Sequence, residues 1–192
     1  MIVLAIVGMP GSGKSTAAQY LKKNKQVTVI YFGQVIIREI LLRGLEVNAS
    51  NGQMVREDLR SKQGMDICAK LSLPSIKAAM ISGNIVVIDG LYSFSEYKTL
   101  RKEFHDKLVV VAIFCPRKLR YARLEIRKER PLTIFEAEMR DYAEIERIEK
   151  GGPIAMADYV IINDTTFEHF FHSIDQFFDK HLSELLSECS ED

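Results

Sequence analysis

Near its amino end the chain reads Gly8-Met9-Pro10-Gly11-Ser12-Gly13-Lys14-Ser15. These residues match the pattern G-x-x-x-x-G-K-[ST], in which a glycine-rich loop joins a strand to a helix. Residues 2–7, directly before the loop, are all apolar and indicate a strand. Directly after it, Ala17, Ala18 and Leu21 follow helical spacing. The motif therefore stands in the setting that a phosphate-binding loop requires, which argues against a glycine-rich turn with an incidental lysine.

The chemistry of this loop depends on its backbone and on two side chains. Glycines let backbone N–H groups turn inward, and the start of the following helix adds partial positive charge. Lys14 is expected to reach the β and γ phosphates of a nucleotide, and the Ser15 hydroxyl is expected to ligand Mg²⁺. Because the chain contains no NKxD motif, with which GTPases read guanine, the predicted cofactors are ATP and Mg²⁺. The loop residues expected to bind the nucleotide are Gly8, Gly11, Ser12, Gly13, Lys14, Ser15 and Thr16.

Runs rich in β-branched residues alternate with stretches of helical period along the chain. The expected strands are residues 2–7, 27–32, 85–88, 108–114 and 159–162. Nearly continuous apolar runs of this kind are typical of strands covered on both faces, as in parallel sheets. Helix starts are indicated where a hydroxyl residue is followed three positions later by Glu or Gln, at Ser50, Ser93, Thr133 and Thr165. The sequence thus predicts an α/β fold in which a five-stranded parallel sheet has helices on both faces.

The composition limits the classes of protein and of partner. A length of 192 residues predicts a single domain over residues 1–192. The 26 basic and 26 acidic residues balance, so no global field attracts nucleic acid or an anionic membrane. The apolar run at the amino end, residues 1–7, is too short to cross a bilayer and lacks the features of a signal peptide. We therefore expect a cytoplasmic protein with a small-molecule nucleotide substrate and no nucleic-acid or membrane partner.

Outside the loop, several segments carry a resemblance to known nucleotide kinases. Residues 31–39 resemble the G-D-x-x-R turn of adenylate-kinase-like nucleoside monophosphate kinases, whose arginine holds the acceptor phosphate. Residues 86–90 resemble their third strand, which ends in Asp-Gly. Residues 157–163 resemble the A-D-x-x-I-x-N ending that is common in dephospho-CoA kinases. The order of these segments makes the whole chain similar to the P-loop nucleotide-kinase-like family, and in particular to dephospho-CoA-kinase-related proteins.

This resemblance implies the P-loop NTP hydrolase fold and roles for residues far from the loop. Asp89, at the end of the third strand, is expected to reach Mg²⁺ or to lie beside the acceptor, so Ser15 and Asp89 form the predicted metal site. Gln34 stands where the acceptor turn of the family has Asp, and Arg38 follows on the same side of a helix. The residues expected to bind the acceptor are Gly33, Arg38, Arg60, Gly90 and Arg140.

A strongly basic segment follows the fourth expected strand. Residues 117–130 contain seven basic and two acidic residues in a chain of zero net charge. Arg120, Arg123 and Arg127 are spaced to form one stripe on a helix, and such a stripe can grip the oxygens of a polyphosphate. The alternative is a solvated helix face whose charges pair with the acids of residues 133–149.

The resemblance implies that this segment belongs to a lid. The family pattern of an R-x-x-x-R pair followed by Arg-Asp is met by Arg123, Arg127 and Arg140 with Asp141. We therefore expect a short helical lid over about residues 117–149. Because the stretch between the two arginine motifs is short and has no cysteines, we expect this lid to hold no zinc. Arg123 is expected to bind the nucleotide as well. Lys14, Asp89, Arg123 and Arg127 are the predicted catalytic residues.

The function favoured by these features is that of an ATP- and Mg²⁺-dependent phosphotransferase with a small nucleotide acceptor, preferably a nucleoside or deoxynucleoside monophosphate. A hydroxyl acceptor requires a general base, and the end of the second strand offers Gln34 where dephospho-CoA kinases have Asp. Asp89 remains available as such a base, so dephospho-CoA kinase and nucleoside kinase are kept as alternatives. An alternative of another class is an ATP-binding regulatory protein with little turnover.

Overall fold

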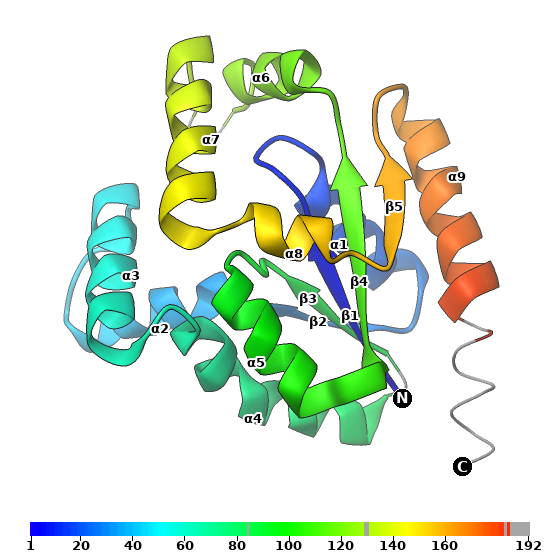
Figure 1. Cartoon of the computed structure of the whole chain (residues 1–192), viewed down its shortest axis with the longest axis horizontal. Coiled ribbons are helices and arrows are strands. Elements are labelled where there is room, and N and C mark those ends of the chain that lie inside the picture. Colours follow the sequence, from blue (N-terminus) through cyan, green and yellow to red (C-terminus); the bar gives the residue numbers. More distant parts are fainter. Residues whose placement is uncertain (84, 129–130, 183, 185–192) are drawn as a thin grey trace.

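The computed structural model describes residues 1–83, 85–128, 131–182 and 184. Within them five parallel strands form one sheet in the order β2-β3-β1-β4-β5 (Figure 1). The strands are β1 (Ile2–Val7), β2 (Thr28–Tyr31), β3 (Ile85–Asp89), β4 (Leu108–Phe114) and β5 (Tyr159–Ile162). Each expected strand is confirmed, with ends that differ by one residue at most. The predicted α/β fold with a five-stranded parallel sheet is therefore confirmed.

Helices cover both faces of this sheet. They are α1 (Lys14–Asn24), α2 (Gly33–Leu42), α3 (Ala49–Gln63), α4 (Ile67–Ser82), α5 (Phe94–Phe104), α6 (Arg117–Glu125), α7 (Ile134–Ile148), α8 (Gly151–Ala155) and α9 (Phe167–Phe177). Short 3₁₀ and π turns follow α5 and α9, at His105–Lys107 and Phe178–Leu182. In the part of the chain that the structure describes, no helix is both long and apolar enough to cross a membrane.

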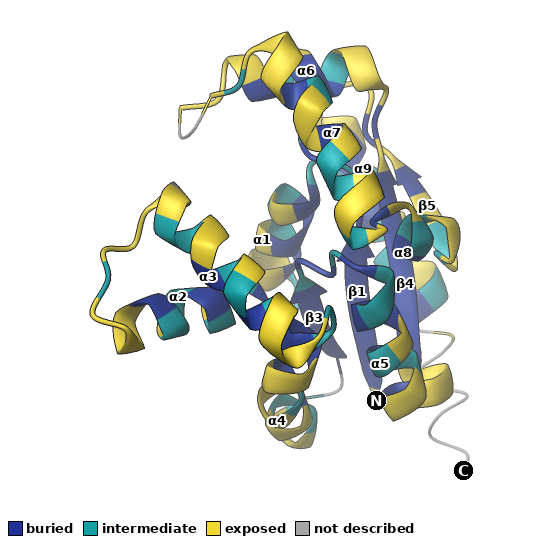
Figure 2. Cartoon of the chain, turned by 60° about the vertical axis from the view of Figure 1, so that its left-hand side comes forward, coloured by how far each residue is buried: buried dark blue, intermediate teal, exposed yellow. Residues whose placement is uncertain are grey.

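Two separate cores follow from the alternation of side chains along the central strand. Val3, Ala5 and Val7 of β1 pack with apolar residues of α2, α3, α4 and α5, whereas Leu4 and Ile6 pack with those of α1 and α9. All six residues of β1 are buried, as a strand covered on both faces must be. Figure 2 shows the central strands β1, β3 and β4 buried, while the outward faces of α3 and α6 are exposed.

The helix starts agree only in part with the prediction. Ser93 and Thr133 form the expected capping boxes with the glutamates three residues later. The start at Ser50 is wrong, because Asn48 caps α3 instead by accepting from the backbone of Asn51 at 2.9 Å. The start at Thr165 is displaced by one residue, since Thr166 directly precedes α9 and accepts the capping hydrogen bond. Both corrections follow from the equal ability of neighbouring Asn, Ser and Thr side chains to cap a helix.

The register of the sheet positions the phosphate loop. Ile6 of β1 lies opposite Asp89 at the end of β3, and Val7 lies opposite Ala112 in β4. The loop leaves β1 after Val7, and the carboxyl ends of parallel strands meet at one edge of the sheet. The loop and Asp89 are therefore brought together by strand pairing alone.

Candidate active site

The loop between β1 and α1 has a backbone that glycine alone adopts without strain. Gly8, Gly11 and Gly13 have φ angles of 144°, 78° and 103°. A Cβ atom added to Gly8 would lie 2.5 Å from the backbone oxygen of Ile113, and one added to Gly11 would lie 2.7 Å from that of Arg120. The loop is thus held tightly against the end of β4 and against α6, with no space for side chains at these positions.

Lys14 begins α1 and is buried beside the loop. Its Nζ atom donates a hydrogen bond to the backbone oxygen of Met9 at 3.0 Å, so the side chain reaches back to the start of the loop. Burial, and next the charge of Lys150, lowers the pKa of Lys14 to about 7. A phosphate beside this ammonium group would favour its charged form, and the site therefore favours an anionic ligand.

Ser15 and Asp89 meet next to Lys14. Burial raises the pKa of Asp89, and a hydrogen bond from Ser15 together with the charge of Lys14 opposes that rise. A hydroxyl and a carboxylate are ligands of the kind that Mg²⁺ prefers. The hydroxyl of Ser12 is buried in the loop and has no hydrogen-bond partner among the described residues, so it can donate to a phosphate oxygen. These residues fit a magnesium nucleotide.

A second buried lysine lies close to Lys14. Lys150 is 1% exposed and donates a hydrogen bond from Nζ to Glu144 in the last turn of α7. Arg140, one turn earlier, donates to the other oxygen of Glu144 at 2.9 Å. Burial would raise the pKa of Glu144, but the charges of Lys150 and Arg140 outweigh it and hold that pKa below its usual value. Our sequence analysis missed Lys150, and the predicted contact of Arg140 with the acceptor stays a prediction.

The basic segment does not form the predicted stripe. Helix α6 ends at Glu125, because the chain turns back and the N–H of Leu132 donates to the backbone oxygen of Leu124 at 3.1 Å. Leu132 then packs on the small core that joins α6 to α7. Arg127 consequently lies beyond the helix, and the expectation that it continues the stripe is wrong. The expected helical hairpin over residues 117–149 is present as α6 and α7.

Arg120 has a structural role rather than an exposed place on that stripe. Its two terminal nitrogens bond both carboxylate oxygens of Asp141 in α7, at 3.2 and 2.7 Å. One of them also donates to the backbone oxygen of Pro10 at 2.9 Å, and the hydroxyl of Tyr121 donates to Asp141 at 3.1 Å. The buried pair ties α6, α7 and the phosphate loop to one another. Pairing with the acids of the next helix, the alternative for this segment, is thus realised by Arg120.

Arg123 also contacts the protein near the loop. It donates to the backbone and side-chain oxygens of Asn163, at 3.1 and 3.2 Å, and to the sulfur of Cys115 at 3.3 Å. Asn163 in turn donates its amide to the backbone oxygen of Ser12 at 2.8 Å. Asn163 therefore links Arg123 to the loop by hydrogen bonds. The roles of Arg123 in nucleotide binding and catalysis stay predictions.

The residues predicted to bind the acceptor are spread over several elements. Arg60 of α3 lies 3.5 Å from Glu96, the buried glutamate that caps α5, and the Nε of Arg60 is buried with no partner among the described residues. Gly90 has a φ of 106° and is covered by the ring of Tyr92, which a Cβ atom would approach to 2.9 Å. Gly33 begins α2 beneath the ring of Tyr31. Arg38 is exposed on α2 and is not brought to the other site residues by any contact that the structure describes.

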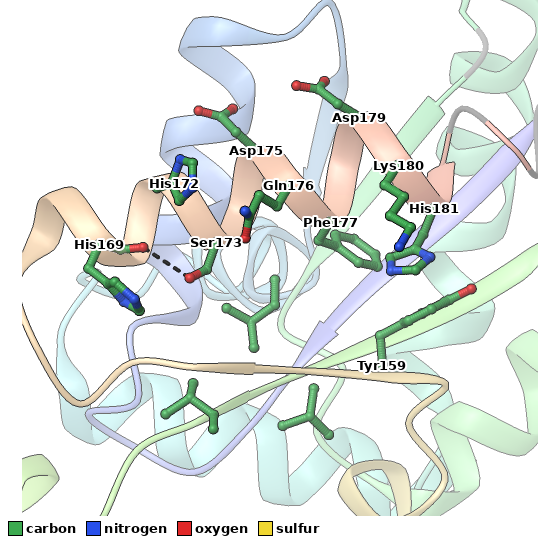
Figure 3. Close-up of a pocket in the computed structure, with 13 residues that line it drawn as sticks. Tyr159, His169, His172, Ser173, Asp175, Gln176, Phe177, Asp179, Lys180 and His181 are labelled. Carbon is green, nitrogen blue, oxygen red and sulfur yellow. Dashed lines mark hydrogen bonds between the residues drawn. The ribbon is translucent and has the colours of Figure 1, made fainter.

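A pocket beside β5, an edge strand of the sheet, is separate from this site. It lies between β5 and α9 and includes His169, His172 and His181 (Figure 3). None of the predicted site residues lines it. Its polar contacts are internal to the protein, as in the hydrogen bond from Ser173 to the backbone oxygen of His169 at 3.0 Å. The candidate active site therefore remains at the phosphate loop.

Comparison with known proteins agrees with this geometry. Residues 7–149 match the family described as AAA domain. A UPF0200/UPF0201 protein of Archaeoglobus fulgidus is 36% identical over 92% of this chain and 54% of its own length, so the chain spans about half of that relative. A UPF0200 protein of Thermococcus kodakarensis is 33% identical over 96% of this chain and 100% of its own length.

A solved structure with low sequence identity has the same fold. Shikimate kinase from Acinetobacter baumannii in complex with shikimate is 18% identical and superposes with a TM-score of 0.57, over 98% of this chain and 94% of that one. This likeness and the phosphate loop confirm the predicted P-loop kinase-like architecture. Because its curated relatives match nearly the whole chain at more than 30% identity, the protein belongs to the UPF0200 family, with an AAA domain of the P-loop kinase-like type.

Proposed function

We propose that this protein is an ATP- and Mg²⁺-dependent phosphotransferase whose acceptor is a small nucleotide, with a nucleoside or deoxynucleoside monophosphate as the favoured substrate. The observation that carries the proposal is the meeting of Lys14, Ser15 and Asp89 beside the glycine loop, at the carboxyl edge of the sheet. Bound Mg²⁺ would supply positive charge to the phosphate oxygens. Lys14 would stabilise the charge that develops on the transferred group.

The contact between Ser15 and Asp89 also favours a phosphate acceptor over a hydroxyl acceptor. A hydroxyl must lose a proton to a general base, whereas a phosphate is already anionic and needs nearby cations. Asp89 is directed at the metal ligand Ser15, and the end of β2 is followed by Gln34 rather than by a carboxylate. The buried Nε of Arg60 has no partner among the described residues, and it and the guanidinium of Arg140 are donors that suit a second phosphate.

The hairpin of α6 and α7 is proposed to act as the lid of this site. The buried pair of Arg120 and Asp141 fastens the hairpin to the loop at Pro10, so movement of the hairpin and of the loop is linked. Arg123, through Asn163, and Arg127 would then reach the nucleotide when the lid closes. The cytoplasmic location and the absence of nucleic-acid and membrane partners stay predictions.

A turnover assay tests the function directly. ATP and Mg²⁺ are offered with each nucleoside monophosphate, its deoxy form, each nucleoside and dephospho-CoA, while ADP release is measured. Turnover with a monophosphate is the expected result. Turnover only with dephospho-CoA or a nucleoside would replace the acceptor, and nucleotide-dependent thermal stabilisation without any turnover would indicate a regulatory protein. Absence of nucleotide binding would overturn the site itself.

The substitution Asp89→Asn separates the two acceptor classes. With a phosphate acceptor, Asp89 acts on the metal, and raising the Mg²⁺ concentration should partly restore turnover. With a hydroxyl acceptor, the loss of a general base would cost roughly 100- to 10,000-fold in rate, and added metal would restore nothing. A turnover rate of Asp89→Asn that does not change across a Mg²⁺ titration would therefore contradict the monophosphate-kinase proposal.

A further inference from the structure

Two buried lysines, Lys14 and Lys150, come together with the largely buried Glu144 where α7 ends, next to the exposed Arg140. Lys150 and Arg140 both hydrogen-bond Glu144, and Lys14 lies close enough that its pKa responds to all three of these charges. The side chains of Lys150 and Glu144 are 2% and 15% exposed, so their charges are poorly hydrated. Glu144 thus serves both Lys150 and the exposed Arg140, while Lys14 faces them from α1, where the charge of Asp89 also acts on it.

The backbone holds Lys150 in this place. Helix α7 ends at Glu149 with a φ of 54°, and the N–H of Lys150 donates back to the oxygen of Glu144 at 3.1 Å. Two residues later the chain passes so close to α5 that a Cβ atom on Gly152 would lie 2.7 Å from the ring of Phe94. Between these two constraints the Lys150 side chain lies over the ring of Tyr92, with Nζ 4.8 Å from the ring centre.

Burying these charges destabilises the folded protein unless a bound ligand interacts with them. Removing charges from water costs several kcal/mol per ion, and a buried pair is often no more stable than well-packed apolar residues. Lys150 contacts both the carboxylate of Glu144 and the ring of Tyr92. These contacts hold its ammonium group in position but do not neutralise its charge completely. An anion of high charge that enters between Lys14 and Lys150 would complete the charge balance.

We propose that Lys150 is a second phosphate-binding lysine, which contacts the terminal phosphate of a bound nucleoside triphosphate while Glu144 positions it. This inference rests on the proposed nucleotide site and assigns one more residue to it. The terminal phosphate is chosen because the loop lysine of this motif already reaches the β and γ phosphates. Lys150 is brought to the same edge of the sheet by Tyr92, whose ring lies under Nζ of Lys150 and covers Gly90, the residue directly after Asp89. Lys150 should consequently distinguish a triphosphate from a diphosphate.

The test compares two variants that differ only at residue 150. Glu144→Gln keeps Lys150, whereas Glu144→Gln/Lys150→Met removes it without leaving a buried carboxylate unpaired. The dissociation constants of Mg·ADP and of the magnesium complex of the imido analogue of ATP are measured by calorimetry. The ratio of the two constants reports recognition of the terminal phosphate and is unaffected by a uniform loss of stability. Lys107→Met, in the exposed turn directly before β4, is the matched control.

Wild-type protein, Lys107→Met and Glu144→Gln should all prefer the triphosphate, and the double variant should lose about tenfold of that preference. A double variant whose ratio stays within about twofold of Glu144→Gln would overturn the role of Lys150 alone. Wild-type protein that binds neither nucleotide would overturn the proposed function, and this inference with it. Should the double variant fail to fold, Glu144→Gln/Lys150→Gln, whose two amides can hydrogen-bond to each other, is measured in its place by the same criterion.

Discussion

Two of the buried ion pairs that the described residues form lie in the hairpin region of this protein, and they differ in how completely their polar atoms are hydrogen-bonded. In the pair of Arg120 and Asp141, a guanidinium and a carboxylate share two hydrogen bonds, and the remaining bonds go to Pro10 and Tyr121. In the pair of Lys150 and Glu144, the carboxylate is shared with Arg140.

This difference suggests a structural role for the pair of Arg120 and Asp141, and it is the basis for the ligand-binding role proposed for Lys150. A closed pair, in which both carboxylate oxygens and both terminal nitrogens are bonded, resists water and ligands alike, and it serves to fasten the hairpin to the phosphate loop. A pair with excess positive charge beside Lys14 retains attraction for an anion. Burial of charge alone does not identify a binding residue, and it is the incomplete neutralisation of Lys150 that makes this lysine the candidate.

The largest effect is expected at Lys14, the lysine of the phosphate loop. Lys14→Ala should lower phosphoryl transfer by on the order of 3 kcal/mol or more in barrier height, because it removes the charge that stabilises the transferred group. Turnover of the purified variant, with its folding checked by circular dichroism, measures the effect. Retention of more than about a tenth of wild-type turnover would show that the loop is not catalytic.

The next largest effect is expected when the closed pair is broken. Asp141→Asn should lower the free energy of unfolding by about 3 kcal/mol, because Arg120 is then buried beside a neutral partner. Urea denaturation measures this loss, and Glu146→Gln, on an exposed position of the same helix, is the control. A loss below about 1 kcal/mol would mean that this pair does not fasten the hairpin.

The two pairs also explain which parts of the molecule could be predicted from the sequence. The strands and the phosphate loop are specified by contiguous residues, through apolar runs and through glycines at fixed spacing. Lys150 follows a helix end and precedes Gly151-Gly152, a polar context that indicates only a helix stop. Its burial results from packing of α8 against α5, which no local pattern encodes.

The basic segment was misinterpreted for the same reason. Helical spacing assigned Arg120, Arg123 and Arg127 to one face, but their actual environments depend on Asp141, Asn163 and the turn before Leu132. Side chains that meet through tertiary contacts can be identified as candidates from charge, although their partners cannot.

A smaller effect, on pH dependence, follows from the lowered pKa of Lys14. Burial, and next Lys150, brings this pKa to about 7, and an anionic ligand favours the charged form. Below that pH Lys14 is charged already, and above it nucleotide binding must take up a proton. Affinity for ADP should therefore fall above about pH 7, by up to about tenfold per pH unit. Calorimetry in buffers of different ionisation enthalpy counts the proton, and Lys14→Arg, which stays charged, should abolish the uptake. Constant affinity from about pH 7 to about pH 9 would contradict the lowered pKa.

The smallest effect is expected at a third ion pair, which repeats the chemistry of the closed pair one turn away. Arg117 and Glu138 precede Arg120 and Asp141 by three residues on each helix, but they lie 3.6 Å apart with side chains 66% and 37% exposed. Water and salt screen such a pair, so a double-mutant cycle with Arg117→Ala and Glu138→Ala should give a coupling energy below about 1 kcal/mol, and turnover should not change. The two pairs have the same spacing along α6 and α7 and differ in burial and in hydrogen bonding. A coupling above about 2 kcal/mol would therefore show that these two features do not distinguish the pairs of this hairpin.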